Sequence, residues 1–324
     1  MDRFNSLLLE MYRAAREVPL ADFQDVVLNR LSSVVPFDSA KWGSSVAHGG
    51  GVVFHDPHVQ NESPEAQQHY AEVHSQDAAA RYAITHFGQT ANYSLPGYYA
   101  GQDSAAIRGY VRRWRHEQAL ITAFNSPATG LIRSLSLYGA YANRPFTECQ
   151  RRIVQAVVPH LFEALAVNRS QHLDRWSSAD PQRLWSLSIT DSAGYFLVKD
   201  AQFEALLERE WPQSDRAAAP PPLLRAIGGN RQAKFKGHSI LVVGCRNKNL
   251  QFLKARALQA VDDLTPQQIQ VAQRVAQGLT HKEIAKALGI APSTTRNHLQ
   301  AILARTSLHN NAELAAQLKS AGYC

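Results

Sequence analysis

Apolar residues near the amino terminus recur at intervals of three and four, which is the repeat of a helix with one buried face. One such stripe runs from Phe4 to Ala15, and a second runs from Phe23 to Leu31. Short runs rich in β-branched and aromatic residues follow, a pattern typical of strands. These runs lie at 40–46, 52–54, 120–125 and 131–138.

A long helix is predicted to close this first region. It begins at Phe146 and carries apolar residues at helical spacing as far as Leu165, with a kink expected at Pro159. Two amphipathic helices, a sheet and a closing helix together predict an α+β domain over residues 1–170. The polar stretch 171–182 that follows is predicted to be a linker or an extension of the helix.

A second α+β region is predicted over residues 183–257. Its strands are expected at 184–190, 195–198, 239–245 and 250–253, with a helix around Phe203, Leu206 and Leu207. Asp191-Ser192-Ala193-Gly194, between the first two strands, has the composition of a hairpin turn. Pro220–Pro222 is expected to interrupt the chain after the helix. The alternative is that both regions form one larger sheet domain.

Residues 264–318 carry the strongest local signals and predict four short helices. Three helix starts have a capping pair, at Thr265–Gln268, Thr280–Glu283 and Asn310–Glu313. In such a pair the first side chain accepts a hydrogen bond from the backbone of the first turn. Gly289 stands where the second helix needs a left-handed residue to end, and Pro292 then opens the third helix. Two capped helices separated by a tight turn predict a helix-turn-helix.

The third of these helices divides into two faces. The face expected to pack on the other helices carries Thr295, Leu299, Ile302 and Leu303. The opposite face carries Arg296, Asn297 and Gln300. Arg pairs with the O6/N7 edge of guanine, and Asn or Gln pairs with the N6/N7 edge of adenine, so this face is predicted to read bases in a major groove. Phosphate contacts, which fix register, are expected from Lys282, Ser293, Thr294 and Arg305.

With these elements in place, the tail resembles the DNA-binding domain of LuxR-type transcriptional regulators (the LuxR/FixJ class). The landmarks are Leu264-Thr265-Pro266, Gly278-Leu279, Lys282-Glu283-Ile284-Ala285, Leu288-Gly289-Ile290, Pro292, Thr294, Asn297-His298, Ile302 and Ala312-Glu313-Leu314. The resemblance implies an all-α four-helix domain over residues 262–324, with a dimer contact on the last helix, expected at Leu314 and Leu318. The chain departs from the family pattern at Gln268, Ala291, Thr295 and Thr306. The missing N-cap hydroxyl at Ala291 should cost about 1 kcal/mol of local helix stability.

The two upstream regions carry resemblances of their own. The run from Arg144-Pro145-Phe146 to Pro159-His160-Leu161 resembles the end of GAF-type domains. The second region, a strand pair, a helix and further strands before the helix-turn-helix, is similar to a PAS domain. The predicted fold is therefore an α+β sensor region, GAF-like then PAS-like, followed by an all-α LuxR-type domain. No phosphorylatable receiver domain is apparent, so a one-component regulator is favoured over a response regulator.

Aromatic residues concentrate in the middle of the first region. The candidates for lining an apolar effector pocket are Trp42, Phe54, Tyr70, Tyr82, Phe87 and Tyr93, although large aromatics also fill cores. Asp56-Pro57 after Trp42 resembles the acyl-homoserine lactone pocket of quorum-sensing LuxR proteins, but the tryptophan-to-tyrosine spacing of that pocket is absent. No metal or cofactor is predicted, because the histidines fit no ligand spacing such as H-E-x-x-H. The histidines expected to be scattered over the surface are His55, His58, His69, His74 and His86.

Composition narrows the class of protein only slightly. A formal net charge of +7 over 324 residues favours contact with polyanions, yet residues 262–324 hold only six basic side chains against four acidic ones. Three cysteines without a CxxC pair, and no signal peptide, indicate a reducing cytoplasm. The longest apolar stretch, 156–167, is too short and too polar to span a bilayer. Without a G-x-S-x-G elbow or a Walker loop, no enzyme activity is expected.

The sequence therefore predicts a cytoplasmic one-component regulator whose sensor region binds a small molecule and controls DNA binding through the connector 253–263. The predicted partners are double-stranded DNA, a second copy of the chain, an unidentified effector and RNA polymerase. Two alternatives stay within DNA binding: a ligand-independent regulator whose N-terminal region only dimerises, and an acyl-homoserine-lactone-type receptor. A third is an enzyme or signal-degrading sensor with an accessory DNA-binding tail, for which the sequence offers no catalytic set.

Overall fold

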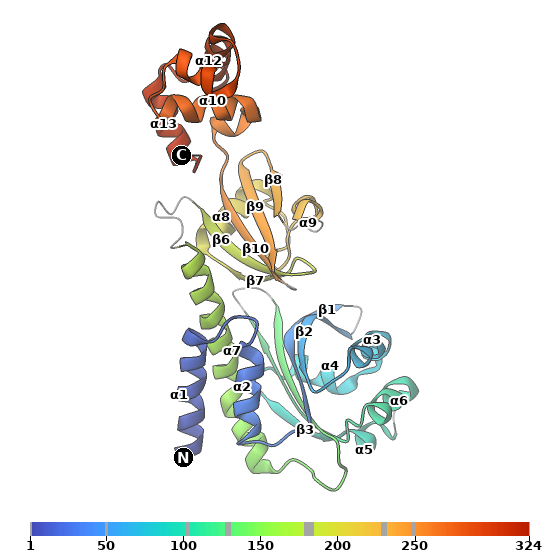
Figure 1. The fold of residues 1–324 in the computed structure, drawn as a ribbon. Helices are drawn as coiled ribbons and strands as arrows, with labels where there is room; N and C mark the ends of the chain where they lie inside the picture. Colours follow the sequence, from blue (N-terminus) through green and yellow to red (C-terminus); the bar gives the residue numbers. More distant parts are fainter. Residues whose placement is uncertain are drawn as a thin grey trace.

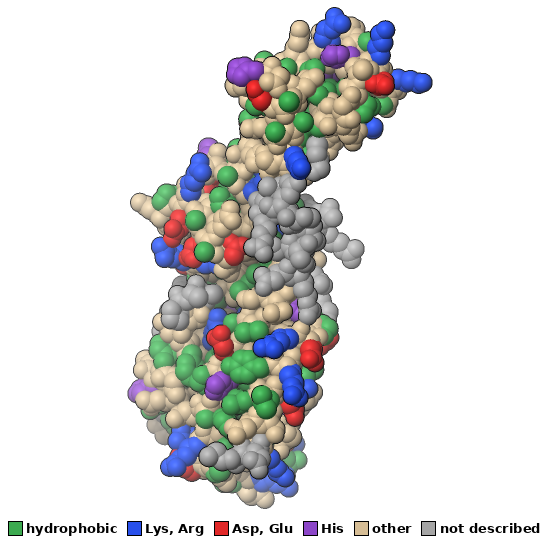
Figure 2. Space-filling model, turned by 90° about the vertical axis from the view of Figure 1, so that its left-hand side faces the viewer, with side chains coloured by type: hydrophobic (Ala, Val, Ile, Leu, Met, Phe, Trp, Pro, Cys, Tyr) green, Lys and Arg blue, Asp and Glu red, His purple; other side chains and the backbone are tan. Residues whose placement is uncertain are grey.

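The computed structural model describes residues 2–48, 51–101, 104–126, 131–177, 185–227, 232–247 and 250–323. They form three units, arranged in chain order along an elongated molecule with the N-terminus at one end (Figure 1). The space-filling view shows the units as three lobes (Figure 2). Across the described residues, no helix combines the length and the hydropathy needed to cross a membrane.

The first unit contains a five-stranded antiparallel sheet in the order β2-β1-β5-β4-β3. Its strands are β1 (Ser39–His48), β2 (Gly51–Gln60), β3 (Thr90–Ser94), β4 (Gln118–Asn125) and β5 (Ile132–Gly139). One face is covered by α1 (Asp2–Glu17), α2 (Phe23–Ser32) and the first part of α7 (Glu148–Ser177). The other face is covered by α3 (Pro64–Val73), the 3-10 turn η1 (His74–Gln76), α4 (Ala78–Thr85), α5 (Leu95–Tyr99) and α6 (Ala105–Arg113).

This sheet has a hydrophobic core on each face, because residues along β4 alternate between the two. Leu120 belongs to the core with α1, α2 and α7, whereas Ala119 and Ile121 belong to the core with α3–α6. Neighbouring strand residues point to opposite faces of a sheet, so one strand supplies both cores. The layout matches the expected α+β domain, although β2 continues to Gln60 instead of ending near Phe54.

Helix α7 joins the first and second units (Figure 1). It continues past Pro159, which is exposed on its surface, and reaches Ser177. Near its end, Leu173 packs against buried aliphatic residues of the second unit. The polar stretch predicted as a linker or helix extension is thus helical as far as Ser177, and 178–184 lie outside the described residues.

The second unit repeats the strand order of the first, as β7-β6-β10-β9-β8. Its elements are β6 (Ser186–Asp191), β7 (Phe196–Lys199), α8 (Ala201–Glu210), α9 (Pro221–Ile227), β8 (Gln232–Lys236), β9 (Ile240–Asn247) and β10 (Leu250–Ala257). The predicted hairpin between β6 and β7 is confirmed, with Gly194 at a φ of +89°. The strands form a sheet separate from the first, so the alternative of one larger sheet is wrong.

Two elements of the second unit differ from expectation. Strand β8 was not predicted, because only two of the five residues in Gln232–Lys236 are apolar. The Pro220–Pro222 run was expected to interrupt the chain, but α9 begins at Pro221. Proline fits the first turn of a helix, where its missing N–H has no intrahelical partner to lose.

The third unit is all-α and is built as its capping signals predict. After the 3-10 turn η2 (Ala260–Asp263) come α10 (Pro266–Ala276), α11 (His281–Leu288), α12 (Pro292–Thr306) and α13 (Asn311–Ser320). The Thr265, Thr280 and Asn310 side chains each accept a hydrogen bond from the backbone three residues on, which confirms all three caps. Gly289 ends α11 at a φ of 65°. The predicted class, an α+β region followed by an all-α domain, is confirmed.

Candidate DNA interface and candidate ligand cavity

Helix α12 presents the predicted base-reading residues to solvent. Arg296, Asn297 and Gln300 are exposed, whereas Thr295 and Ile302 on the opposite face are fully buried in the domain core. The helix lies in the lobe farthest from the N-terminus (Figure 1), and Lys and Arg side chains gather at the tip of that lobe (Figure 2). This arrangement leaves a polar helix face, rich in hydrogen-bond donors, accessible to the major groove of DNA.

The predicted phosphate contacts are not equivalent. Lys282 and Ser293 are exposed and Thr294 is half-buried. Arg305 is exposed, but its guanidinium also donates to the Asp263 carbonyl at 3.1 Å. This bond ties the end of α12 to η2, so Arg305 has a structural partner within the protein besides its predicted phosphate role.

The predicted dimer contact on the last helix is wrong for its two named residues. Leu314 and Leu318 are fully buried, and they pack with α10 and α12 in the core of their own domain. Their spacing of four marks the inward stripe of an amphipathic helix, which the sequence alone does not distinguish from a stripe that faces a partner. Any dimer surface on α13 would need its other side chains.

The six aromatic candidates for an effector pocket do not lie together. Trp42 is buried on the α1–α2–α7 face of the first sheet, whereas Phe54 and Tyr70 lie on the opposite face. The remaining three candidates lie at or near the surface. Tyr82 and Phe87 are 40% and 43% exposed, and Tyr93 packs on Tyr98 at a ring separation of 4.7 Å.

The face of the first sheet under α3–α6 is already filled. The Lys41 ammonium lies over the rings of Phe54 and Tyr70, 4.1 and 3.7 Å from their centroids. Asp77 accepts hydrogen bonds from the Tyr70 hydroxyl at 2.8 Å and the Tyr99 hydroxyl at 2.7 Å. The remaining space is about 20 Å³, which suits a water molecule and excludes an effector.

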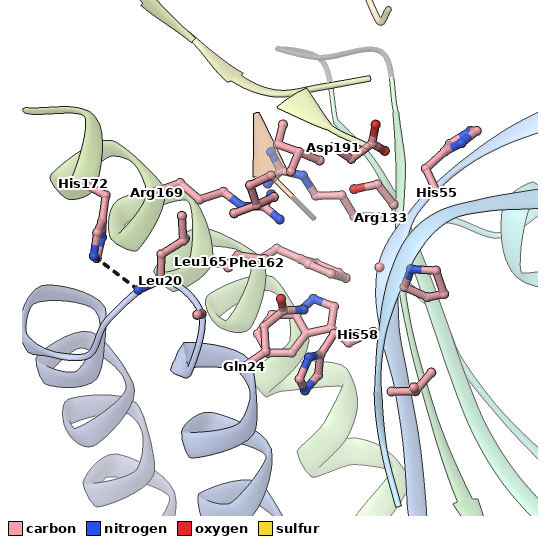
Figure 3. A pocket seen from close by; sticks show the side chains of 18 of the residues that line it. Leu20, Gln24, His55, His58, Arg133, Phe162, Leu165, Arg169, His172 and Asp191 are labelled. Atoms are coloured by element: carbon pink, nitrogen blue, oxygen red, sulfur yellow. Dashed lines mark hydrogen bonds between the residues drawn. The ribbon is translucent and has the colours of Figure 1, made fainter. Parts of the chain in front are cut away.

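A much larger cavity lies on the other face of the first sheet, where the first and second units meet. Its volume is about 880 Å³. Its walls come from α2 and the segment before it, β1, β2, β5 and α7 of the first unit, and from β6, β7 and β10 of the second. Of the six aromatic candidates only Trp42 lines it. Figure 3 shows Arg133 of β5 and Arg169 of α7 reaching into the same space near Asp191 of β6.

Two of the five histidines expected to be scattered over the surface, His55 and His58, line this cavity instead. His55 is buried and its ring stacks on Tyr195 of the second unit at 3.6 Å. Burial lowers the pKa of His55, so its ring is neutral at neutral pH. His172 accepts a hydrogen bond from the Leu20 amide at its Nε2 and bonds the Asn168 carbonyl through its Nδ1, which fixes a neutral tautomer. Among the described residues, no group of three or more His, Cys, Asp or Glu side chains is placed to hold a metal.

The third unit matches a known family. The model for bacterial regulatory proteins of the luxR family covers residues 262–318. The C-terminal unit is a LuxR-family DNA-binding domain. The transcriptional regulatory protein UhpA of Salmonella typhimurium is 40% identical over 57 residues, which are 18% of this chain and 29% of UhpA. The chain thus spans less than a third of the length of this curated relative.

Solved structures are similar to longer parts of the chain, but only weakly. Escherichia coli SdiA is 11% identical with a TM-score of 0.37, and the match covers 99% of this chain and 98% of SdiA. The phycoerythrobilin-bound GAF domain of a cyanobacterial phytochrome is 13% identical with a TM-score of 0.35, covering 52% of this chain and 97% of that domain. Similarities of this size carry no argument about the upstream units.

The LuxR-family domain is attached to the second unit by a buried ion pair. The Arg256 guanidinium at the end of β10 donates to both carboxylate oxygens of Asp262 in η2, each at 2.6 Å. The Tyr323 hydroxyl, beyond α13, donates to Asp262 at 2.9 Å. Burial alone would raise the pKa of Asp262, but hydrogen bonds from Arg256 and the Gln259 amide outweigh it and lower the pKa. The connector predicted at 253–263 is short and structured, since β10 runs to Ala257 and η2 (Ala260–Asp263) follows.

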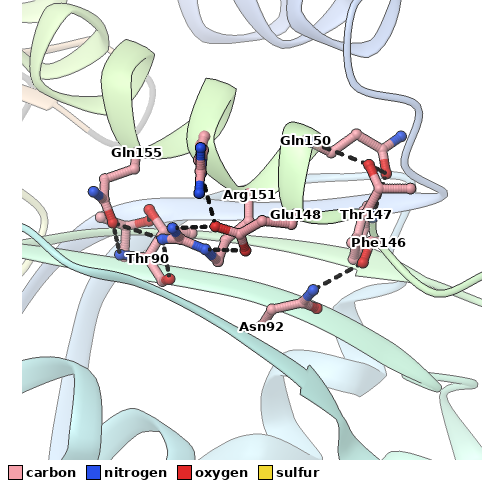
Figure 4. Close-up of polar contacts among 10 residues, drawn as sticks. Thr90, Asn92, Phe146, Thr147, Glu148, Gln150, Arg151 and Gln155 are labelled. Atoms are coloured by element: carbon pink, nitrogen blue, oxygen red, sulfur yellow. Dashed lines mark hydrogen bonds and ion pairs between the residues drawn. The ribbon is translucent and has the colours of Figure 1, made fainter.

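A second polar cluster, at the start of α7, has a structural role. Arg151 bonds Glu148 and donates to the Thr90 carbonyl of β3 at 3.1 Å, and Asn92 donates to the Phe146 carbonyl at 2.8 Å (Figure 4). The bond from Arg151 satisfies the Thr90 carbonyl of the edge strand β3, and unpaired backbone groups of an edge strand are otherwise open to pairing. Hydrogen bonds from Arg151 and from the following arginine lower the pKa of the exposed Glu148 to about 2. The cluster therefore fastens the start of α7 to the edge of the sheet.

Proposed function

We propose that this chain is a cytoplasmic one-component transcriptional regulator that binds double-stranded DNA as a homodimer and responds to a small-molecule effector. The observation that carries the proposal is the shared exposure of Arg296, Asn297 and Gln300 on the helix after the turn. Their donors and acceptors match guanine and adenine edges in a major groove. The luxR-family match of the same residues supports this role, and RNA polymerase is a further expected partner.

Base reading is tested by fluorescence anisotropy on a DNA fragment that the full chain selects from a random pool. Arg296→Ala should weaken binding by about 1–3 kcal/mol and relax preference at one base pair, because a bidentate base contact is lost. Lys282→Ala should weaken selected and random DNA equally and lower the salt slope by about one unit. Arg225→Ala is the matched control, because it removes one exposed charge from α9, outside the DNA-binding domain. Equal losses on both DNAs with Arg296→Ala would contradict base reading.

A dimer is expected because one recognition helix buries too little surface for tight specific binding. The face formed by α1 and the start of α7 is the proposed contact. Leu9 of α1 is 61% exposed, and a groove of about 480 Å³ nearby is lined by Phe4, Ile153 and Ala156, among others. Hydrophobic side chains gather on the same face (Figure 2). Exposed apolar patches of this kind mark interaction sites.

Sedimentation of the full chain tests the dimer. Leu9→Arg should shift the population towards monomer, because it places a charge in the proposed contact. Tyr141→Arg, at a residue 43% exposed outside α1 and α7, is the control and should leave the distribution unchanged. A monomer for the unmodified chain, free and on selected DNA, would overturn the dimer.

Effector control is proposed to run through β10 and η2, since these elements join the second unit to the LuxR-family domain. A ligand must bind the DNA-competent and DNA-incompetent arrangements with different affinity to shift their populations. A thermal-shift screen against a metabolite panel should find a compound that raises the melting temperature. A screen without any such compound would favour the ligand-independent alternative. An effector response that survives Gly-Ser residues inserted after Ala260 would contradict this route.

A further inference from the structure

The cavity of about 880 Å³ between the first and second units is a site that the DNA-binding role does not use. We propose that it binds an amphipathic anion, with an apolar body and one carboxylate, sulfonate or phosphate-like head group, and that this ligand is the effector. The regulatory role of the ligand rests on the proposed function, but the binding itself does not.

The charges that reach the cavity favour an anion. Its lining includes two guanidinium groups, Arg133 and Arg169, against one carboxylate, Asp191. One oxygen of Asp191 already accepts hydrogen bonds from the amides of Ala193 and Tyr195, at 3.0 and 2.8 Å. The three lining histidines do not reverse this balance, since an imidazole is either neutral or positive. Guanidinium groups bind carboxylate, sulfonate and phosphate oxygens with paired hydrogen bonds.

Two acids that interact with Arg133 and His58 lie outside the cavity lining. Glu163, which acts on Arg133, is exposed on α7. Asp25 bonds the His58 imidazole at 2.9 Å and is half exposed. The described lining therefore keeps an excess of positive charge in a place that is partly removed from water, where a ligand anion gains more from it.

The apolar part of the wall sets the body of the ligand. It consists largely of Leu20, Trp42, Phe162, Leu165, Leu197 and Phe252. The volume falls in the range of about 300–1,000 Å³ that pockets for small molecules occupy. A ligand that is only an inorganic anion would leave this apolar wall wet, so an amphipathic molecule fits better.

The position of the cavity connects it to the DNA-binding domain. Leu250 and Phe252 of β10 line the wall, and Arg256, which pairs with Asp262, follows on the same strand. Four residues of strand span roughly 13 Å. A ligand that contacts β5 and α7 on one side and β10 on the other stabilises the relative position of these elements. Because β10 leads directly to η2, the position of β10 affects the position of η2.

Two fluorescent dyes test the binding with the full chain and without DNA. The first, 8-anilinonaphthalene-1-sulfonate, is an amphipathic anion, and the second, N-phenyl-1-naphthylamine, has the same rings without the sulfonate. Arg133→Met should weaken the anionic dye about tenfold or more, because a charge-assisted hydrogen bond is lost, and should leave the neutral dye unchanged. Arg133→Lys should retain most of the affinity for the anionic dye. Unchanged binding of the neutral dye also shows that the variant still folds.

Further variants locate the site. Leu197→Trp and Leu250→Trp each fill part of the cavity and should weaken both dyes, whereas Arg225→Met on α9 should weaken neither. The proposal is overturned if the anionic dye binds Arg133→Met and Arg169→Met as tightly as the unmodified chain. It is also overturned if neither tryptophan variant changes binding, or if the unmodified chain binds neither dye. Selected DNA is titrated with the same preparations, so the proposed function can stand or fall separately from the ligand site.

Discussion

The sheets of the first and second units place their five strands in the same relative order, but they are covered differently. The first sheet has a large core on each face, with α1, α2 and α7 on one side and α3–α6 on the other. The second sheet has one large core, with α8 and α9. Its other face carries a small cluster in which Leu187, Ile189 and Leu197 meet Leu173 of α7.

This difference explains where the large cavity lies. A sheet must bury its apolar face against another element, and the second unit supplies helices for one face only. The end of α7 and the neighbouring unit cover the other face, and two preformed surfaces meet there less completely than helices that fold onto their own sheet. The helices of the first unit thus cover both faces of its own sheet. The second unit contacts the first unit on one side and the LuxR-family domain on the other.

The largest expected effect concerns the neighbour on the C-terminal side. Asp262→Ala should destabilise the contact between the second unit and the LuxR-family domain by about 3–5 kcal/mol, because it leaves the Arg256 guanidinium buried without its partner. Asp263→Ala is the matched control. It removes a partly exposed partner of Lys236 and should cost less than about 1 kcal/mol. Urea unfolding followed by probes in each unit measures both, and equal effects would mean that the buried pair does not hold the domains together.

Side-chain truncations in the two sheets test how tightly each sheet is packed against the elements that cover it. Leu137→Ala removes a fully buried side chain from the core of the first unit and should lower the free energy of unfolding by about 2–5 kcal/mol. Leu197→Ala, beside the cavity, should cost less than about 2 kcal/mol, since its side chain already borders open space. Thermal and chemical unfolding of both variants give the comparison. A larger loss for Leu197→Ala would show that the interface is packed as tightly as a core.

The pH dependence of stability reports on the filled face of the first sheet. Burial lowers the pKa of Lys41 to about 8, against the attraction of Glu62 and Asp77, and the pKa in the unfolded chain is about 10.4. Between these values the unfolded chain binds more protons, so stability rises with pH. The unmodified chain should gain about 2 kcal/mol relative to Lys41→Met between pH 8 and about 9.5. Unfolding free energies of the two proteins are measured at both pH values. A difference between the proteins that does not change with pH would contradict a lowered pKa of Lys41.

The smallest effect concerns the stacked rings of His55 and Tyr195, which join the two units. A double-mutant cycle with His55→Leu and Tyr195→Leu should give a coupling energy of about 1 kcal/mol, the size expected for an aromatic pair beyond its buried area. The readout is the unfolding midpoint of the second unit. Additive effects of the two changes would mean that the contact contributes nothing to the coverage of that sheet.

Local signals account for what the sequence predicted well. The caps at Thr265, Thr280 and Asn310 and the turn at Gly289 each depend on residues at most three or four positions apart, so their spacing alone defines the helices. The hairpin ending at Gly194 is equally local. Strand β8 was missed because its short run is mostly polar, and its pairing with β9 is decided by residues distant in sequence.

The sequence by itself determined the helix-turn-helix and the face of α12 that carries Arg296, Asn297 and Gln300, because a helix fixes which side chains share a face. It did not determine what the apolar stripes face. Leu314 and Leu318 turned inward, and the aromatic candidates separated onto two faces of one sheet or to the surface. Only the tertiary structure placed Arg133 and Arg169 in one cavity with β10, since that meeting depends on how two separately folded sheets cover each other.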